Sequence, residues 1–168
     1  MKAPSPDFLE LLKTMFKHEV DFIIVGGVSA VLHGAPVTTF DLDLLHSRTP
    51  DNVERLLAAL KILGAYYRGV GERRIEPDKI QLSSAGHQLL MTRLGPLDLL
   101  GTIGKEKYDY ADLLEHTKKM QISGMTFLVL DLETHIQIKE GLGQEKDKAT
   151  VPILRRTLEE TRVKDTVA

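Results

Sequence analysis

The chain has 168 residues, of which 42% are hydrophobic and 27% are charged, and its formal net charge at pH 7 is −2. This length suits one well-buried core, and no Pro- or Ser-rich linker divides it, so we expect a single domain over residues 1–168. A charge near zero excludes a global basic field that binds nucleic acid through its phosphates alone. No apolar run reaches the about 18 to 20 residues of a membrane span, and the N-terminus is amphipathic rather than signal-like. The absence of cysteine excludes disulfides and thiolate metal sites. We therefore expect a cytoplasmic protein without membrane contact.

The N-terminal segment has the pattern of a helix that packs on a sheet. Ser5 and Pro6 are typical of an N-cap and a first helical residue. The apolar residues that follow repeat with helical spacing: Phe8, Leu11, Leu12, Met15 and Phe16.

The next stretch predicts a strand, a glycine turn and a short helix. The run 22–25, Phe-Ile-Ile-Val, suits a buried strand, and Gly26-Gly27 ends it where the backbone can turn sharply and approach a ligand closely. Residues 29–32 continue with the first turns of a helix. Backbone N–H groups at the start of a helix favour a negatively charged group such as phosphate.

Two carboxylates alternate with leucines in the stretch 40–45, Phe-Asp-Leu-Asp-Leu-Leu. If this stretch is a strand, Asp41 and Asp43 lie on one face about 6.6 to 7 Å apart, while Leu42 and Leu44 point into the core. Carboxylates so spaced can converge on divalent ions, whereas without a cation their like charges repel. Two solvated surface acids are the plainer alternative.

The remaining pattern alternates helices and strands, which indicates a mixed α/β fold. A helix is expected from Thr49-Pro50 to Gly64. Residues 71–79 are expected to form a charged loop or hairpin. The arginines in and near it, Arg68, Arg73 and Arg74, are either solvated or contact a substrate. The other expected elements are strands at 65–70, 80–82, 87–93, 97–100, 119–122 and 126–130, and helices at 108–114, after Asp131, and at about 146–161.

A third carboxylate, Asp98, stands between apolar neighbours on the expected strand 97–100 and either caps the next turn or belongs to a site. Two lysines, Lys139 and Lys146, flank a glycine-containing segment between the last two helices. Their ammonium groups either bind phosphates as point charges or only balance helix ends.

These motifs resemble the signature of the DNA polymerase β-like nucleotidyltransferase superfamily. Val25-Gly26-Gly27, a spacer of thirteen residues, and Asp41-Leu42-Asp43-Leu44 reproduce its order of a hydrophobic residue, a glycine pair and Asp-x-Asp. The wider wording, with Ala30, His33-Gly34 and Thr39, is similar to small bacterial nucleotidyltransferases related to AbiEii-type abortive-infection toxins. The segment 139–147 resembles their Lys-x-x-x-Gly-Arg-x-Lys-Asp motif, with Gln144 in place of the Arg.

The resemblance implies a small mixed sheet flanked by helices, with a core at about 1–130 and C-terminal helices at about 131–168. It implies transfer of a nucleoside monophosphate from an NTP to an acceptor, with two Mg²⁺ ions, or Mn²⁺ in their place. Roles would follow by position: Asp41, Asp43 and Asp98 as metal ligands and catalytic residues, and Gly26, Gly27, Ser29, Lys139 and Lys146 as nucleotide-binding residues.

The acceptor stays open among tRNA, protein and a small molecule, and a toxin–antitoxin or phage-defence role would add a cognate toxin or antitoxin as partner. One position departs from the resembling proteins, which often carry a basic residue where this chain has Val37. The alternative is therefore a catalytically weak or idle module of the same fold that binds a nucleotide or a partner protein.

Overall fold

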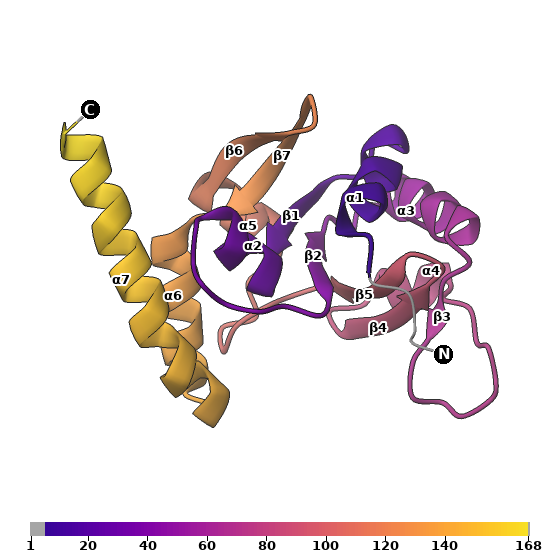
Figure 1. The fold of residues 1–168 in the computed structure, drawn as a ribbon. Coiled ribbons are helices and arrows are strands. Elements are labelled where there is room, and N and C mark those ends of the chain that lie inside the picture. The colour runs from indigo at the N-terminus through magenta and orange to yellow at the C-terminus, as the bar shows by residue number, and fades with distance from the viewer. Residues whose placement is uncertain (1–5, 168) are drawn as a thin grey trace, which may run out of the picture.

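A seven-stranded mixed sheet forms the centre of the protein (Figure 1). The structure is a computed structural model that describes residues 6–167. Its strands are β1 (Phe22–Val25), β2 (Leu42–His46), β3 (Tyr66–Tyr67), β4 (His87–Thr92), β5 (Gly95–Leu100), β6 (Thr117–Ile122) and β7 (Met125–Leu130). Its helices are α1 (Phe8–Lys17), α2 (Gly26–Leu32), α3 (Pro50–Ile62), α4 (Lys79–Leu82), α5 (Tyr110–Leu113), α6 (Leu132–Leu142) and α7 (Glu145–Val167), with a 3-10 turn η1 at Leu114–His116.

The order of strands across the sheet is β3-β4-β5-β2-β1-β7-β6. The interior strand β1 is antiparallel to β2 and parallel to β7, and the central strand β2 is parallel to β5. The predicted α/β class, with a mixed sheet and C-terminal helices, is confirmed. No helix within residues 6–167 is both long and apolar enough to cross a membrane.

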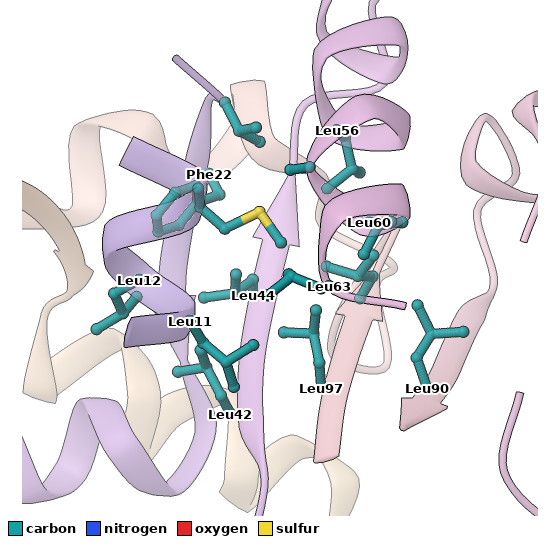
Figure 2. Close-up of a cluster of buried hydrophobic side chains, with 14 of the residues drawn as sticks. Leu11, Leu12, Phe22, Leu42, Leu44, Leu56, Leu60, Leu63, Leu90 and Leu97 are labelled. Atoms are coloured by element: carbon teal, nitrogen blue, oxygen red, sulfur yellow. The ribbon is translucent and has the colours of Figure 1, made fainter. Parts of the chain in front are cut away.

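The largest core lies on one face of the sheet, beneath α1 and α3 (Figure 2). Leucines from the two helices meet Leu42 and Leu44 of β2 and Leu97 of β5 there. A second cluster on the other face contains Leu45 of β2, Leu130 of β7 and residues of α5 and α6. Since successive strand residues point to opposite faces, Asp43 shares the face of Leu45. The carboxylate therefore lies on the side of the sheet away from the main core.

The C-terminal helices form a third layer of contacts beside α2. Ala30 and Ala35 pack with Leu132 and Ile136 of α6 and Leu154 of α7. Figure 1 shows α7 lying alongside α6 at one end of the molecule. Val37 is packed against this same cluster. The position that often carries a basic residue in the resembling proteins therefore faces an apolar cluster here.

Three expected element boundaries were wrong for local reasons. Helix α1 begins at Phe8, after an Asp7 cap whose side chain accepts from Glu10 N, so Pro6 precedes the helix, and Ser5 lies outside the described residues. Strand β2 begins at Leu42, and Asp41 lies in the bend before it. Strand β3 covers two residues of the expected 65–70.

One expected strand is a helix. Residues 79–82 form α4, which Asp78 and Gln81 start with a reciprocal capping box. Each side chain accepts a hydrogen bond from the other residue's backbone N–H, and this satisfies two N–H groups that a new helix leaves unpaired. Of the two apolar residues in this segment, Leu82 is buried in the main core and Ile80 is exposed. Two apolar residues two apart were too short a pattern to distinguish the two structures.

Candidate active site

The turn between β1 and α2 lies directly against a carboxylate. Strand β1 ends at Val25 and α2 begins at Gly26, whose φ of +66° is a left-handed conformation that favours glycine. A Cβ atom at Gly26 would lie 2.0 Å from Oδ2 and 2.9 Å from Cβ of Asp43. Only a residue without a side chain allows this approach of the backbone to Asp43.

The second glycine is restricted by a different neighbour. A Cβ atom at Gly27 would lie 2.6 Å from both Cβ and Oγ1 of Thr39. The Thr39 hydroxyl donates to the backbone oxygen of Asp41 at 3.0 Å. Gly27 thus gives room to the segment that leads into β2, and its predicted contact with phosphate stays a prediction.

Two of the three predicted carboxylates are neighbours across the sheet. Asp43 of β2 and Asp98 of β5 are register partners in the parallel pair. The flanking residues Leu97 and Leu99 point into the main core, so Asp98 lies on the same face of the sheet as Asp43. Residues 55 positions apart in the chain thereby place two acidic side chains side by side, and their membership of one site stays a prediction.

The charge of Asp43 is poorly compensated. The pKa of Asp43 is raised from its ordinary 3.8 to about 7, first by burial and then by the neighbouring carboxylates of Asp98 and Asp41, while Arg68 opposes the shift. Both causes disfavour the ionised form. A bound cation would remove the conflict between these charges.

Arg68 contacts the second carboxylate. Its Nη2 lies 2.8 Å from Oδ1 of Asp98, and the Asp98 side chain is 12% exposed. The same Oδ1 atom is buried and lacks an aligned hydrogen bond, so the contact is an ion pair rather than a well-formed hydrogen bond. The sequence predicted Arg68 only in or near a charged loop, because no local pattern links it to Asp98, which lies 30 positions later in the chain.

Asp41 is less closely integrated than the other two carboxylates. It is partly exposed in the bend before β2, although its charge acts on Asp43. Across residues 6–167, no three His, Cys, Asp or Glu side chains are grouped tightly enough to hold a metal ion as they stand. The joint role of Asp41, Asp43 and Asp98 as ligands therefore stays a prediction.

The donor set nevertheless fits a hard divalent cation. Carboxylate oxygens are the ligands that Mg²⁺ prefers. The pKa of Asp43 is raised first by burial and then by the negative charges of Asp98 and Asp41, and the guanidinium of Arg68 contacts Asp98 rather than Asp43. The Asp43 carboxylate therefore lacks a positive partner of its own. Mg²⁺ held by these carboxylates would supply it.

A cleft of about 700 Å³ opens beside these residues. Gly26 and Asp43 line it together with the lysines predicted from the C-terminal segment, Lys139 and Lys146. Lys139 forms an ion pair with Asp147, with 3.1 Å between Nζ and Oδ1, while Lys146 is exposed. The structure thus brings both lysines to the cleft that Asp43 lines, and their contact with phosphate stays a prediction.

Ser29 lies below the surface of this cleft. Its side chain is fully buried, and its hydroxyl donates to the backbone oxygen of Leu130 at 3.3 Å. The ring of His33 donates from Nε2 to the same oxygen at 2.7 Å. In this arrangement the Ser29 side chain links α2 to β7, and its predicted role toward phosphate stays a prediction.

His135 is a buried residue of the cleft that the sequence did not single out. It is 4% exposed, and its Nδ1 atom has no hydrogen-bond partner. The pKa of His135 is lowered to about 4, first by burial and then by the charges of Lys139 and His33, while Asp147 opposes the shift. Its position four residues before Lys139 on α6 was the one available signal.

We expect His135 to make stability fall in mild acid. The unfolded chain binds a proton near pH 6.5 and the folded chain only near pH 4, so stability is lost as pH falls between these values. The loss is on the order of 2 to 3 kcal/mol, since one pKa unit corresponds to about 1.4 kcal/mol. Urea unfolding from pH 7 to pH 4 should show a shallower decline in His135→Gln than in wild type. The exposed His116→Gln serves as control, and equal slopes in all three proteins would contradict the expectation.

Similarity to known proteins was found at the level of structure. In comparisons by sequence, no protein-family model and no curated protein matches the chain. The candidate nucleotidyltransferase TM1012 from Thermotoga maritima superposes with a TM-score of 0.56 at 18% identity, over 91% of this chain and 93% of that chain. The lincosamide antibiotic adenylyltransferase LnuA, bound to lincomycin, gives a TM-score of 0.60 at 10% identity, over 90% and 98% of the two chains. This is the polymerase β-type nucleotidyltransferase fold.

A third solved structure is similar to this chain and has the same nucleotidyltransferase fold. ANT(2'')-Ia in complex with adenylyl-2''-tobramycin gives a TM-score of 0.57 at 15% identity, over 94% of this chain and 90% of that chain. At such identities the likeness establishes the nucleotidyltransferase fold alone. The activity must be argued from the carboxylates and the cleft.

Proposed function

We propose that the protein is a Mg²⁺-dependent nucleotidyltransferase that moves a nucleoside monophosphate from an NTP to an acceptor. The observation that carries the proposal is the register pairing of Asp43 with Asp98, with the backbone of Gly26 lying against Asp43. Paired carboxylates beside an open cleft fit phosphoryl transfer, in which positioning and charge stabilisation supply most of the catalysis. Divalent ions held there would neutralise the triphosphate and lower the pKa of the attacking hydroxyl.

The chain's own residues would divide the work by position. Asp41 and Asp43 hold the ions, and the backbone at Gly26 and Gly27 faces the triphosphate. The acceptor oxygen forms a bond to the α-phosphorus as the bond to pyrophosphate breaks, and pyrophosphate leaves. Asp98 accepts the proton of the acceptor hydroxyl. Lys139 and Lys146, which line the same cleft, balance charge on the β- and γ-phosphates; Ser29 supports the glycine turn from beneath.

The structural comparisons support transfer of an adenylyl group in particular. LnuA is an adenylyltransferase, and ANT(2'')-Ia was observed with an adenylylated antibiotic. The small-molecule acceptors of those two proteins are not carried over to this chain. The acceptor here is a tRNA, a protein or a small molecule. The motif resemblance to AbiEii-type proteins adds a role in toxin–antitoxin or phage-defence systems, with a cognate toxin or antitoxin as partner.

A catalytically idle module that binds a nucleotide or a partner protein is the second candidate. The reason to consider this candidate is that the chain has Val37 where the resembling proteins often carry a basic residue. Because Val37 packs into the apolar cluster between α2 and the C-terminal helices, a cation from this position is not part of the cleft. The paired carboxylates favour activity, since a binding module would not need two acids side by side across the sheet.

Incubation with each labelled NTP and Mg²⁺, in the presence of total RNA and cell lysate, tests the proposal. We expect labelled acceptor and released pyrophosphate from wild type, and at least a hundredfold less, in order of magnitude, from Asp98→Asn. Asp165→Asn, an exposed substitution on α7, should match wild type. Absence of label with every NTP, together with NTP binding in calorimetry, would instead support the idle module.

A further inference from the structure

Arg68 is held at three points beside the carboxylate pair. Its backbone N–H donates to the oxygen of Leu89 at 3.0 Å, and its Nη1 donates to the oxygen of Leu90 at 2.6 Å. Its Nη2 then lies 2.8 Å from Oδ1 of Asp98. Because the guanidinium is planar and rigid, anchoring Nη1 on β4 determines where Nη2 presents its charge. The contact with Asp98 is therefore built into the strand pairing rather than made by a free side chain.

The surroundings make this ion pair different from an ordinary surface pair. Exposed ion pairs contribute little to stability, but the side chains of Arg68 and Asp98 are only 26% and 12% exposed. Asp98 also faces Asp43, its register partner on the neighbouring strand. Removing the guanidinium would leave buried negative charges facing one another. With it, the three carboxylates of the site carry a formal charge of −2, which one divalent ion balances.

We propose that Arg68 is a positioning residue of the carboxylate site, acting as its built-in counter-ion and occupying Oδ1 of Asp98, so that Oδ2 is left for a divalent ion. The metal-binding part of this inference rests on the proposed function. The counter-ion part does not, because it concerns the protein without metal. Arg68 thereby keeps the empty site compatible with a folded sheet, and it limits how strongly the site attracts a cation.

A double-mutant cycle in EDTA tests the counter-ion. We expect Arg68→Gln to lower the melting temperature by several degrees, and the same change to cost much less in an Asp98→Asn background, where the negative charge is already gone. A residue that merely held its loop would cost the same in both backgrounds, and that result would overturn the inference. If Arg68→Gln alone does not fold, the double variant must fold, and its failure would be equally decisive.

Mn²⁺ titration, followed by the electron paramagnetic resonance signal of the free ion, tests the metal-binding part. Removing a positive charge beside the site should make Arg68→Gln bind Mn²⁺ more tightly, by roughly threefold or more, because like charges at this range repel strongly. Arg68→Lys keeps the charge and should bind with nearly wild-type affinity. Arg74→Gln is the matched control, since this arginine on the same loop stacks 4.7 Å above the Tyr66 ring and should leave the affinity unchanged.

The outcomes separate this inference from the proposed function. Wild-type protein that binds no Mn²⁺ at millimolar concentration would overturn the proposed function and the metal-binding part of this inference, while the counter-ion part is decided by the double-mutant cycle in EDTA. Wild-type binding with unchanged or weaker binding by Arg68→Gln would overturn the role of Arg68 alone. Tighter binding by Arg68→Gln that Arg68→Lys reverses is the result that a loop-holding role cannot produce.

Discussion

Asp43→Asn is expected to abolish Mg²⁺-dependent transfer and to stabilise the metal-free protein at pH 8. The transfer depends on Asp43 as a ligand, and loss of such charge stabilisation costs at least about a hundredfold in rate. The stability gain arises because burial and the neighbouring carboxylates raise the pKa of Asp43 to about 7 from 3.8. The folded protein thus loses stability as pH rises between these values, by on the order of 2 to 4 kcal/mol.

Urea unfolding in EDTA at pH 5 and pH 8 measures the second part. His135 and Asp43 act in opposite directions over this range, so the comparison is with wild type at each pH: Asp43→Asn should gain more stability over wild type at pH 8 than at pH 5. Asp165→Asn, on the exposed side of α7, controls for the loss of a carboxylate in general. Undiminished transfer by Asp43→Asn would sink the two-ion mechanism, and an unchanged pH dependence would refute the account of its buried charge.

We expect Gly26→Ala to impair the site more than a single methyl group added at any other position. The new Cβ would lie 2.0 Å from Oδ2 and 2.9 Å from Cβ of Asp43, so rotation of the carboxylate alone does not relieve the contact. Strand β2 would have to shift away from β1, and Asp43 would move with it. We expect at least a tenfold loss, in order of magnitude, of Mg²⁺-dependent NTP affinity in calorimetry, since misplacement of about 1 Å is costly in such sites.

Gly64→Ala is the matched control for this substitution. Gly64 has a φ of +63°, close to the +66° of Gly26, but no atom lies within 4 Å of the position its Cβ would take. Both alanines therefore carry the left-handed backbone cost of about 1 kcal/mol, and only Gly26→Ala also displaces Asp43. Equal NTP affinity in the two variants would mean that Gly26 serves the turn and not the carboxylate.

The sequence predicted the elements that carry the site because their signals are local. An apolar run before a glycine pair indicated β1 and the start of α2, and alternation of leucine with aspartate placed Asp43 on a strand. Leu97, Leu99 and Asp98 repeat that alternation. Thr49 followed by proline likewise indicated the cap and first turn of α3, which the structure confirms.

What the sequence did not predict depends on contacts between distant segments or on short patterns. The ion pair of Arg68 with Asp98 requires the pairing of β3, β4 and β5, and no local rule states it. The ion pair of Lys139 with Asp147 depends on how α6 meets α7. Helix α4 was not predicted, although Asp78 and Gln81 have the spacing of a capping box, because the short apolar pattern of Ile80 and Leu82 fits a strand equally well.

The parallel pairing of β1 with β7 has a consequence for the protein during its synthesis. Ile23 pairs with Leu128, so the interior strand β1 lacks one neighbour until more than a hundred further residues have left the ribosome. Until then the fully buried strand β1 is an unpaired edge of a growing sheet, and such edges can bind other chains. Pairings between distant segments also form slowly. A nascent chain that stops before Met125 therefore carries Asp43 and Asp98 but exposes an apolar strand, which makes it a substrate for chaperones rather than an early, functional fragment.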